Sequence, residues 1–389
     1  MLTVAAPSPR LIAEVTPGRS FAAERLDDFD SALAIAEREA TGGTGTPFQG
    51  RAWLSAWRRA FAGPQSGVAA MAIVARDRAT GELALVLPLA QMRRDGLVVI
   101  AAPDADVTDY NAPILGPAAP TDRAGARRLW AAVRRALPRA DVIEISKAPR
   151  VLAGRANPLA LLGAASPSTL SGNVIDIDTP FETFVRGFER KLRKELGREK
   201  RVFEAIDGAR FEMATDPARA ETILDALARM QAARIRALGR AYRLDDDDAS
   251  SFYRMLVRDG LPRGDVALTA LVVGDEIVAA LLGVIEGDHY AMVRLGQAGA
   301  PWSHFSPGRL VIMETMRALR ARGLKRFDFT IGDYDYKRRL GVAPVPLVDL
   351  VEAASWRGWP RATRHRAKAA LRASPLARGI VRFVRGRRG

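Results

Sequence analysis

The feature that most constrains the fold of this chain is a pattern that occurs twice, once in each half. In each copy a helical segment precedes a short strand in which an acid lies between apolar residues and a hydroxyl group follows. The first strand is Asp141-Val-Ile-Glu144-Ile-Ser146, and the second is Arg326-Phe-Asp328-Phe-Thr330. Because the match falls at the same place in both halves, the sequence predicts two copies of one α/β unit.

The composition is that of a folded protein with room for two domains. Of its 389 residues, 48% are hydrophobic and 26% are charged, so the chain can bury sizeable cores. No apolar run approaches the roughly 18 residues of a membrane span, and we expect a cytoplasmic protein. The chain has no cysteine and only three histidines, at positions 289, 304 and 365. We therefore expect no metal site, no disulfide and no thiol nucleophile.

Positive charge is concentrated at the end of the chain. The formal net charge is +15, and residues 356–389 contain eleven Lys or Arg and no acid. This segment is predicted to form two basic helices split at Ser374-Pro375. Such a tail can lie on the anionic inner face of a membrane or stay solvated. The rest of the chain lacks interleaved basic and aromatic residues, so nucleic acid is not an expected partner, with tRNA as the one exception.

Four segments are expected along the chain. Residues 1–20 are predicted to be a flexible N-terminus, 21–165 a first domain, 166–355 a second domain and 356–389 the basic tail. The linker is predicted within residues 157–172, which are rich in Ala, Pro and Ser.

Two features of the first domain bear on function. An aromatic row of Trp53, Trp57 and Phe61 recurs at helical spacing and indicates a core face. The segment Asp109-Tyr110-Asn111-Ala112-Pro113 is rich in turn-forming polar residues, and a simple Asx turn is one interpretation of it.

The second domain contains a strand, loop, helix, strand sequence from His289 to Gly341. Strands are predicted at His289–Leu295 and Lys325–Ile331, with a helix from Pro307 to Gly323 between them. Ser306 is the predicted N-cap, and Pro307 suits the first helical position. Free N–H groups at this helix start, with Gly308 and the charge of Arg309, predict a phosphate site. Ser-Pro-Gly also serves simply to start a helix.

A basic band follows Phe181 in the predicted long helix. Alternating signs at helical spacing favour a self-paired, solvated surface, and a basic wall for the phosphates of CoA or a nucleotide is the alternative. The band consists of Arg190, Lys191, Arg193, Lys194, Arg198, Lys200 and Arg201, interrupted by Glu189, Glu195 and Glu199.

The second domain resembles the GNAT acyltransferase superfamily. It is most similar to the BioF-like acetyltransferase branch, which includes CelD-type cellulose biosynthesis proteins, and more distantly to the Fem-type aminoacyltransferases. The residues that carry the resemblance are Tyr290, Arg294-Leu295-Gly296, Phe305-Ser306-Pro307-Gly308, Phe327-Asp328-Phe329, Gly332-Asp333, Tyr336-Lys337 and Gly341.

The resemblance implies an α/β fold of the α+β kind with tandem GNAT-like domains. Each domain would have a mixed, mostly antiparallel sheet flanked by helices, and the basic helical tail would follow. It also implies a GNAT-type N-acyltransferase that moves an acyl group, such as acetyl, from acyl-CoA to an amine. The acceptor would be a small molecule or an envelope precursor in polysaccharide or cell-envelope metabolism. The donor's pantetheine arm would lie between the two strands, where backbone N–H groups of the first strand form an oxyanion hole.

The resemblance assigns candidate residues to three roles. Donor binding falls to Leu295, Gly296, Ser306, Gly308 and Arg309, and acceptor binding to Tyr290, Arg294, Asp109 and Tyr110. For catalysis, Asp333 is the predicted base, Tyr336 the proton donor to the leaving thiolate, and Lys337 the charge for a phosphate or oxyanion. A turn or cap role for Asp333 and packing of Tyr336 on the sheet are the structural alternatives. Asp328 is interpreted as mainly structural.

One departure from the GNAT pattern leaves the donor open. The usual pyrophosphate loop is replaced by Phe305-Ser306-Pro307-Gly308-Arg309. An aminoacyl-tRNA or an acyl carrier protein is therefore an alternative donor to acyl-CoA. A non-catalytic protein that keeps the fold and docks on a membrane or polysaccharide-synthesis complex is the alternative function.

Overall fold

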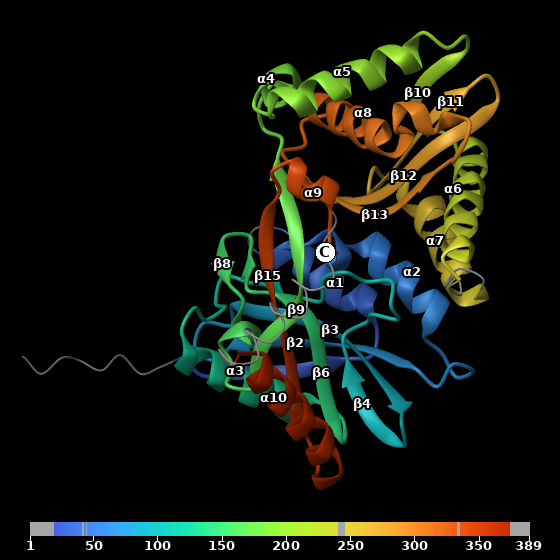
Figure 1. Ribbon diagram of the computed structural model, residues 1–389. Coiled ribbons are helices and arrows are strands. Elements are labelled where there is room, and N and C mark those ends of the chain that lie inside the picture. Colours follow the sequence, from blue (N-terminus) through green and yellow to red (C-terminus); the bar gives the residue numbers. More distant parts are fainter. Residues whose placement is uncertain (1–18, 41–42, 44, 240–245, 333–334, 374–389) are drawn as a thin grey trace, which may run out of the picture.

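A thirteen-stranded sheet runs through both halves of the protein. The computed structural model describes residues 19–40, 43, 45–239, 246–332 and 335–373. Within these residues the strand order is β1-β2-β3-β4-β6-β15-β9-β14-β13-β12-β11-β10, with β5 paired to β3 (Figure 1). Among the described residues, no helix is both long and apolar enough to cross a bilayer.

The first half forms one edge of this sheet. Its antiparallel strands are β1 (Phe21–Leu26), β2 (Ala69–Asp77), β3 (Leu83–Arg94) and β4 (Leu97–Ala101), and β6 (Val142–Pro149) then runs parallel to β4. The helix between the two parallel strands is α3 (Arg123–Ala136).

The second half repeats this order from the other edge. Its antiparallel strands are β10 (Ala209–Met213), β11 (Val266–Val273), β12 (Glu276–Glu286) and β13 (His289–Gln297), and β14 (Arg326–Asp328) runs parallel to β13. Helix α8 (Pro307–Ala321) lies between the parallel strands in sequence, as α3 does in the first half. The predicted repeat and the tandem α/β fold are therefore confirmed.

The last strand of each half lies beside the other half. Strand β9 (Ala165–Asp176) follows β6 in sequence but pairs with β14, and β15 (Ala343–Ala353) follows β14 but pairs with β6. The two strands also pair with each other at the centre of the sheet. The predicted linker at 157–172 was wrong, because a 3-10 turn and most of β9 occupy it. The division into domains stays a prediction.

The remaining elements surround the sheet. The long helix expected from Phe181 is two helices, and the second predicted tail helix lies outside the described residues. These elements are α1 (Phe29–Glu39), η1 (Pro47–Gln49), α2 (Arg51–Phe61), β5 (Ile114–Leu115), β7 (Val151–Leu152), β8 (Arg155–Ala156), η2 (Pro158–Leu161), α4 (Phe181–Arg186), α5 (Arg190–Glu204), α6 (Pro217–Ala237), α7 (Asp247–Gly260), η4 (Trp302–Phe305), α9 (Asp335–Arg339), η5 (Trp356–Gly358) and α10 (Trp359–Ala373).

One hydrophobic core joins the two halves. The indole of Trp53 on α2 meets the ring of Phe252 on α7 edge-on, with ring centroids 4.8 Å apart. Trp53, Trp57 and Phe61 are all buried in this core, which confirms the predicted core face. A second core lies under α8 and contains Tyr290 and Phe327. The shared core means that side chains of both halves meet at the centre of the molecule.

Candidate functional site

The parallel strands β13 and β14 separate after three residue pairs. His289, Tyr290 and Ala291 pair with Arg326, Phe327 and Asp328, where β14 ends, while β13 continues to Gln297. An irregularity in the β12–β13 register also falls in this stretch of β13, between the partners of Leu282 and Gly283. The later part of β13 therefore has a backbone edge with no strand partner in β14. This is the arrangement that the predicted pantetheine slot requires.

Asp328 lies at the point of separation and joins the halves. Its side chain is 2% exposed. One carboxylate oxygen accepts hydrogen bonds from Tyr110 Oη at 2.9 Å and from the Thr330 N–H at 2.6 Å. The other oxygen is 3.4 Å from His289 Nε2. Burial and the Asp328 charge raise the pKa of Tyr110, so this phenol stays a hydrogen-bond donor.

Asp109 lies beside this group. Burial raises its pKa to about 6, while a hydrogen bond with Thr330 and the charge of Lys147 lower the pKa only in part. Asp104 and Asp328 raise it further. The residue as a whole is partly exposed, while its carboxyl group is enclosed by protein, and a pKa near 6 suits proton exchange at neutral pH. The structure therefore places Asp109 and Tyr110 at the strand separation, from the other half of the chain.

The segment after β14 is held in place by hydrogen bonds that its backbone carbonyls accept from Lys337 and Asn173. Thr330 and Gly332 have φ of 58° and 109°. Lys337 Nζ is hydrogen-bonded to the carbonyls of Phe329, Thr330 and Ile331 at 2.8, 3.3 and 3.0 Å. The Asn173 amide donates to the Thr330 and Gly332 carbonyls. Lys337 is buried, and these contacts support a positioning role for it.

The start of α8 differs from the predicted phosphate cradle. Ser306 is the N-cap residue, as predicted, but it is left-handed, with φ of 51°, and its side chain makes no capping hydrogen bond. The N–H groups of Arg309 and Leu310 already donate to the Ser306 carbonyl. The Gln297 side chain lies where a Cβ at Gly308 would be. A donor phosphate here has fewer free N–H groups than the sequence suggested.

Arg309 is paired with two acids of α5. Its Nε donates to Glu199 at 3.0 Å, and its Nη1 donates to Glu195 at 3.1 Å. Glu195 also accepts from Arg339 at 2.8 Å. A phosphate that used Arg309 would have to compete with these carboxylates.

Four other predicted residues face the protein interior. Tyr290 is fully buried, with its ring centroid 4.8 Å from that of Phe327. Arg294 Nε donates to Gln231 at 2.9 Å, and its guanidinium lies 4.7 Å from the centroid of the Tyr253 ring. Gly296 packs against Leu227 of α6, and the Leu295 carbonyl accepts from Gln231. The contacts of Arg294, Leu295 and Gly296 support β13 from the side of α6 and α7, whereas Tyr290 packs in the core under α8.

The structure describes two of the three predicted catalytic residues, Tyr336 and Lys337. Tyr336 is half-buried, with its ring centroid 6.1 Å from that of Phe329, as in the packing alternative. Asp333 lies outside the described residues. Sequence reasoning missed Thr330 and Asn173 as site residues. Thr330 belongs to the repeated motif, but Asn173 carries no signal because its role depends on strand exchange.

A cavity of about 660 Å³ opens at the end of β4 and β6. Asn111 lines it, is 1% exposed and has an Oδ1 without a hydrogen-bond partner, while its Nδ2 donates to Asp104 and to the Ser146 carbonyl. The charged residues that line the cavity are Arg94, Asp104, Asp106, Glu144, Lys147, Asp248 and Asp349.

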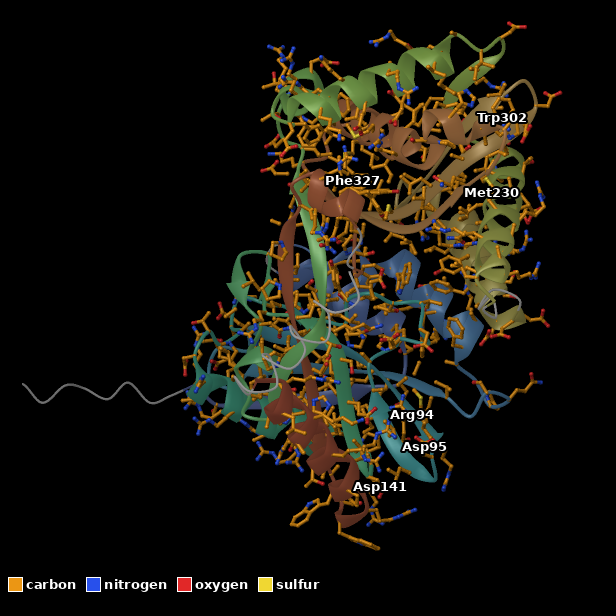
Figure 2. All side chains as sticks on the ribbon, in the orientation of Figure 1. Arg94, Asp95, Asp141, Met230, Trp302 and Phe327 are labelled. Carbon is orange, nitrogen blue, oxygen red and sulfur yellow. The ribbon has the colours of Figure 1, made fainter. Side chains whose placement is uncertain are left out.

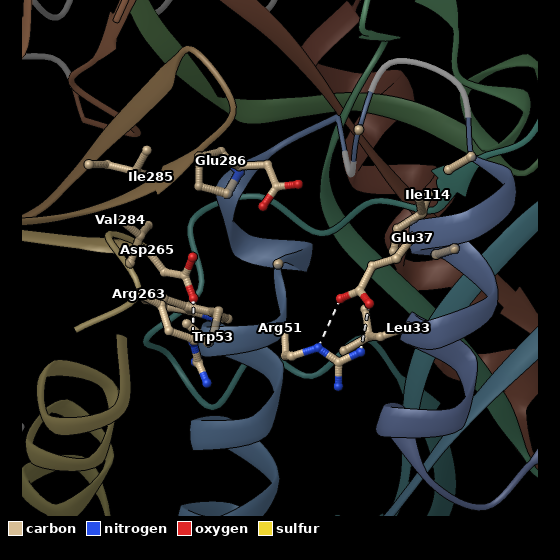
Figure 3. Close-up of a pocket in the computed structure, with 16 residues that line it drawn as sticks. Leu33, Glu37, Arg51, Trp53, Ile114, Arg263, Asp265, Val284, Ile285 and Glu286 are labelled. Carbon is tan, nitrogen blue, oxygen red and sulfur yellow. Dashed lines mark hydrogen bonds and ion pairs between the residues drawn. The ribbon is translucent and has the colours of Figure 1, made fainter. Parts of the chain in front are cut away.

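A second cavity, of about 450 Å³, lies between α1, α2 and strand β12 (Figure 3). Its labelled charges are largely paired with one another. Arg51 Nε lies 2.8 Å from Glu37, and Arg263 Nε lies 2.9 Å from Asp265. We assign no chemistry to this cavity, since its lining includes neither Asp104 nor Lys147, the two charges of the larger cavity that act on Asp109.

Comparison with known proteins finds a matching family for part of the chain. Residues 190–338 match the family described as the acetyltransferase (GNAT) domain. This part of the chain is therefore a GNAT domain, as expected. No curated protein matches the chain.

Two solved structures share the fold. The crystal structure of FemX has 13% identity and a TM-score of 0.58, over 85% of this chain and 97% of that one. A conserved protein of unknown function from Bacteroides thetaiotaomicron has 12% identity and a TM-score of 0.50, over 84% of this chain and 98% of that one. The likeness to FemX fits the expected distant relation to Fem-type proteins.

Proposed function

We propose that this protein is a GNAT-type N-acyltransferase that moves an acyl group from acyl-CoA to an amine. The observation that carries the proposal is the separation of β13 from β14 beside Asp109 and Asp328. A thioester held along the free edge of β13 would have backbone N–H groups near its carbonyl oxygen. Acetyl-CoA is the proposed donor, as expected from the resemblance, and no metal takes part.

Asp109 is the proposed proton acceptor. An amine that arrives as an ammonium ion first releases one proton to water. The neutral amine then attacks the thioester carbonyl, the new C–N bond forms as the C–S bond breaks, and a second proton passes from the nitrogen to Asp109. With a pKa of about 6, Asp109 is mostly ionised at pH 7 and able to accept it. The proton that the leaving thiolate takes up comes from Tyr336 or from water. Asp333 remains a predicted second base.

The 660 Å³ cavity is the proposed acceptor site. Five carboxylates line it against one Arg and one Lys, and the buried Asn111 Oδ1 offers an acceptor to an N–H group. Asp109 does not line the cavity, but Asp104 and Lys147 do, and their charges act on Asp109, so the proposed base lies near this cavity. These features suit a cationic amine, carried by a small molecule or an envelope precursor.

A Fem-like aminoacyltransferase using aminoacyl-tRNA is the second candidate. Glu195 and Glu199 of α5 pair with Arg309 and Arg339, and Glu204 pairs with Lys200, so these three acids do not neutralise the other cations of the helix. Arg190, Lys191, Lys194 and Arg201 are exposed there. This favours the basic-wall interpretation over a self-paired surface, and such a face would suit a polyanionic carrier. Either donor implies work in the cytoplasm.

The test is release of free thiol from acetyl-CoA with a panel of amines. The chain has no cysteine, so a thiol reagent reports only CoA. Asp109→Asn should lower kcat by about 10²–10³-fold, while CoA binding measured by calorimetry stays intact. Asp275→Asn, an exposed aspartate outside the proposed site and outside the lining of the acceptor cavity, is the matched control and should keep full activity.

The donor is decided in parallel with aminoacyl-tRNA. Lys191→Glu with Lys194→Glu should weaken a tRNA-dependent reaction and leave a CoA-dependent one within about twofold. Arg127→Glu on exposed α3 is the control for charge reversal. If neither donor is consumed with any amine, or Asp109→Asn retains full activity, the proposal is wrong and the non-catalytic alternative gains support.

A further inference from the structure

Two tryptophan side chains at one end of the molecule are highly exposed to solvent. Trp356 in η5 is 82% exposed, and Trp359 at the start of α10 is 68% exposed. Leu371 on the same helix is 66% exposed. An indole combines a large apolar ring with one N–H donor, so it is most stable at a boundary between water and an apolar phase. The exposure of two indoles three residues apart therefore indicates a surface that something covers.

A groove lined with arginine flanks Trp356. It has a volume of about 410 Å³ and contains Ser355 and Arg357, the neighbours of Trp356 in sequence, together with Arg134 and Arg139. Val98, Ile100, Leu137 and Ile143 give it an apolar floor. The one acid in its lining, Asp141, accepts from Ser355 Oγ and from the Val98 N–H.

Acids near this groove are already paired with arginine. Asp95 and Glu144 both bind Arg361 of α10, and Arg134 lies 2.5 Å from Glu352. Figure 2 places Arg94, Asp95 and Asp141 at the same end of the molecule as α10. Beyond Arg361 the helix exposes further cations without any acid of its own, at Arg364, Arg366, Lys368 and Arg372. The surface around the two tryptophans is therefore strongly positive.

We propose that this end of the protein binds the surface of an anionic phospholipid bilayer. Trp356 and Trp359 would enter the headgroup region, and Arg139 of the groove would receive a lipid phosphate, because Arg134 and Arg357 are shared with Glu352 and Asp141. The cations of α10 add the attraction to anionic lipid. The groove shares no lining residue with the acceptor cavity, although Glu144, which pairs with Arg361 of α10, lines that cavity. The proposal does not depend on the assigned reaction.

The experiment is co-sedimentation of the full-length protein with two kinds of vesicle. One is phosphatidylcholine alone, and the other contains phosphatidylglycerol as well. We expect clear binding only to the anionic vesicles, and Trp356→Ser with Trp359→Ser should weaken it about tenfold. Combined with the two tryptophan substitutions, Arg139→Glu should weaken binding to the anionic vesicles by a further severalfold, because it reverses one charge in the groove.

Matched variants separate this surface from general stickiness. Leu238→Ser removes an apolar side chain that is 63% exposed elsewhere, and it should bind like the wild type. The tryptophan variant should keep the melting temperature and the acyl-transfer rate in solution. Equal binding by wild type and tryptophan variant would overturn the proposal, as would equal binding to both vesicles. Quenching of tryptophan fluorescence by tRNA but not by brominated anionic lipid would also overturn it.

Discussion

The two halves of this protein end their parallel strands in the same way but in different surroundings. In the first half, Ala101 of β4 lies opposite Glu144 of β6. In the second, Ala291 of β13 lies opposite Asp328 of β14. Each half therefore places an acid at its last parallel pair, as the repeated motif predicted.

The two acids have different partners. Glu144 pairs with Arg94 and Arg361, whose side chains are 41% and 30% exposed. Asp328 is buried and accepts from a tyrosine hydroxyl and a backbone N–H. The first acid attaches α10 to the sheet, and the second organises a buried polar corner. The comparison teaches that the repeated scaffold supplies the position of the acid, while its neighbours decide the role.

Replacing each of the two acids with alanine should reveal the largest difference between the two strand ends. Asp328→Ala leaves Tyr110 Oη and the Thr330 N–H buried without a partner, and we expect a loss of about 4 kcal/mol in unfolding free energy. Glu144→Ala removes partly exposed ion pairs and should cost about 1 kcal/mol. Urea denaturation measures both.

Activity adds a second readout to this pair. Asp328→Asn keeps one acceptor oxygen and serves if the alanine variant does not fold. It should reduce transfer at least tenfold, because it disturbs Thr330 and Asp109. Glu144→Gln should keep the wild-type kcat, while it should raise the KM for the amine because it removes one carboxylate of the acceptor cavity. Equal losses in the two variants would show that the two strand ends do not differ in role.

A glycine that contacts Tyr110 allows a smaller perturbation of the site around Asp328. A Cβ at Gly172 would overlap the Tyr110 hydroxyl, whereas one at Gly163 meets nothing within 4 Å. Gly172→Ala should therefore cost about 2–3 kcal/mol and displace Tyr110 from Asp328. Gly163→Ala is the matched control and should be neutral. If thermal unfolding shows no difference between them, Tyr110 is not tightly held across the halves.

The sequence predicted the repeat and the polar segment around Tyr110, because both depend on local patterns. Alternating apolar residues and turn-forming residues act over a few positions, so the strand–helix–strand units could be found. It failed for β9, whose Ala, Pro and Ser content resembles a linker. That strand forms because β14 and β15 supply its hydrogen-bond partners, and neither is near it in sequence.

The site was harder to predict than the fold for a similar reason. Arg309 was expected to meet a phosphate, yet Glu195 and Glu199 of another helix reach it first. Lys337 was expected to offer its charge, yet three carbonyls of the preceding segment surround it. Sequence spacing shows which groups are present but not which tertiary partner satisfies each one.

A change of pH should sharpen the contrast between Asp109, which lies beside Asp328, and Asp141, which directly precedes β6. Asp109 has a pKa raised from 3.8 to about 6, chiefly by burial. Asp141, at the start of β6, has a pKa lowered by hydrogen bonds from Ser355 and the Val98 N–H. In the folded state, a raised acid pKa favours the protonated form, so Asp109 reduces stability as pH rises from about 4 to about 6 and by a constant amount above that. Asp141 does the opposite, since its contribution is present above its unfolded pKa and is lost as pH falls.

Replacing Asp109 tests this directly. Asp109→Asn should be more stable than the wild type at pH 7 by about 2 kcal/mol, allowing for its partial exposure, and the difference should vanish below about pH 4. Asp141→Asn should be less stable at pH 7 and should approach the wild type in acid. The wild-type rate should rise with pH through about 6, and the residual rate of Asp109→Asn should not. Denaturation and rate profiles over this range check both. A gain in stability with loss of rate is the pattern of a residue kept for chemistry, since a purely structural acid would lose both.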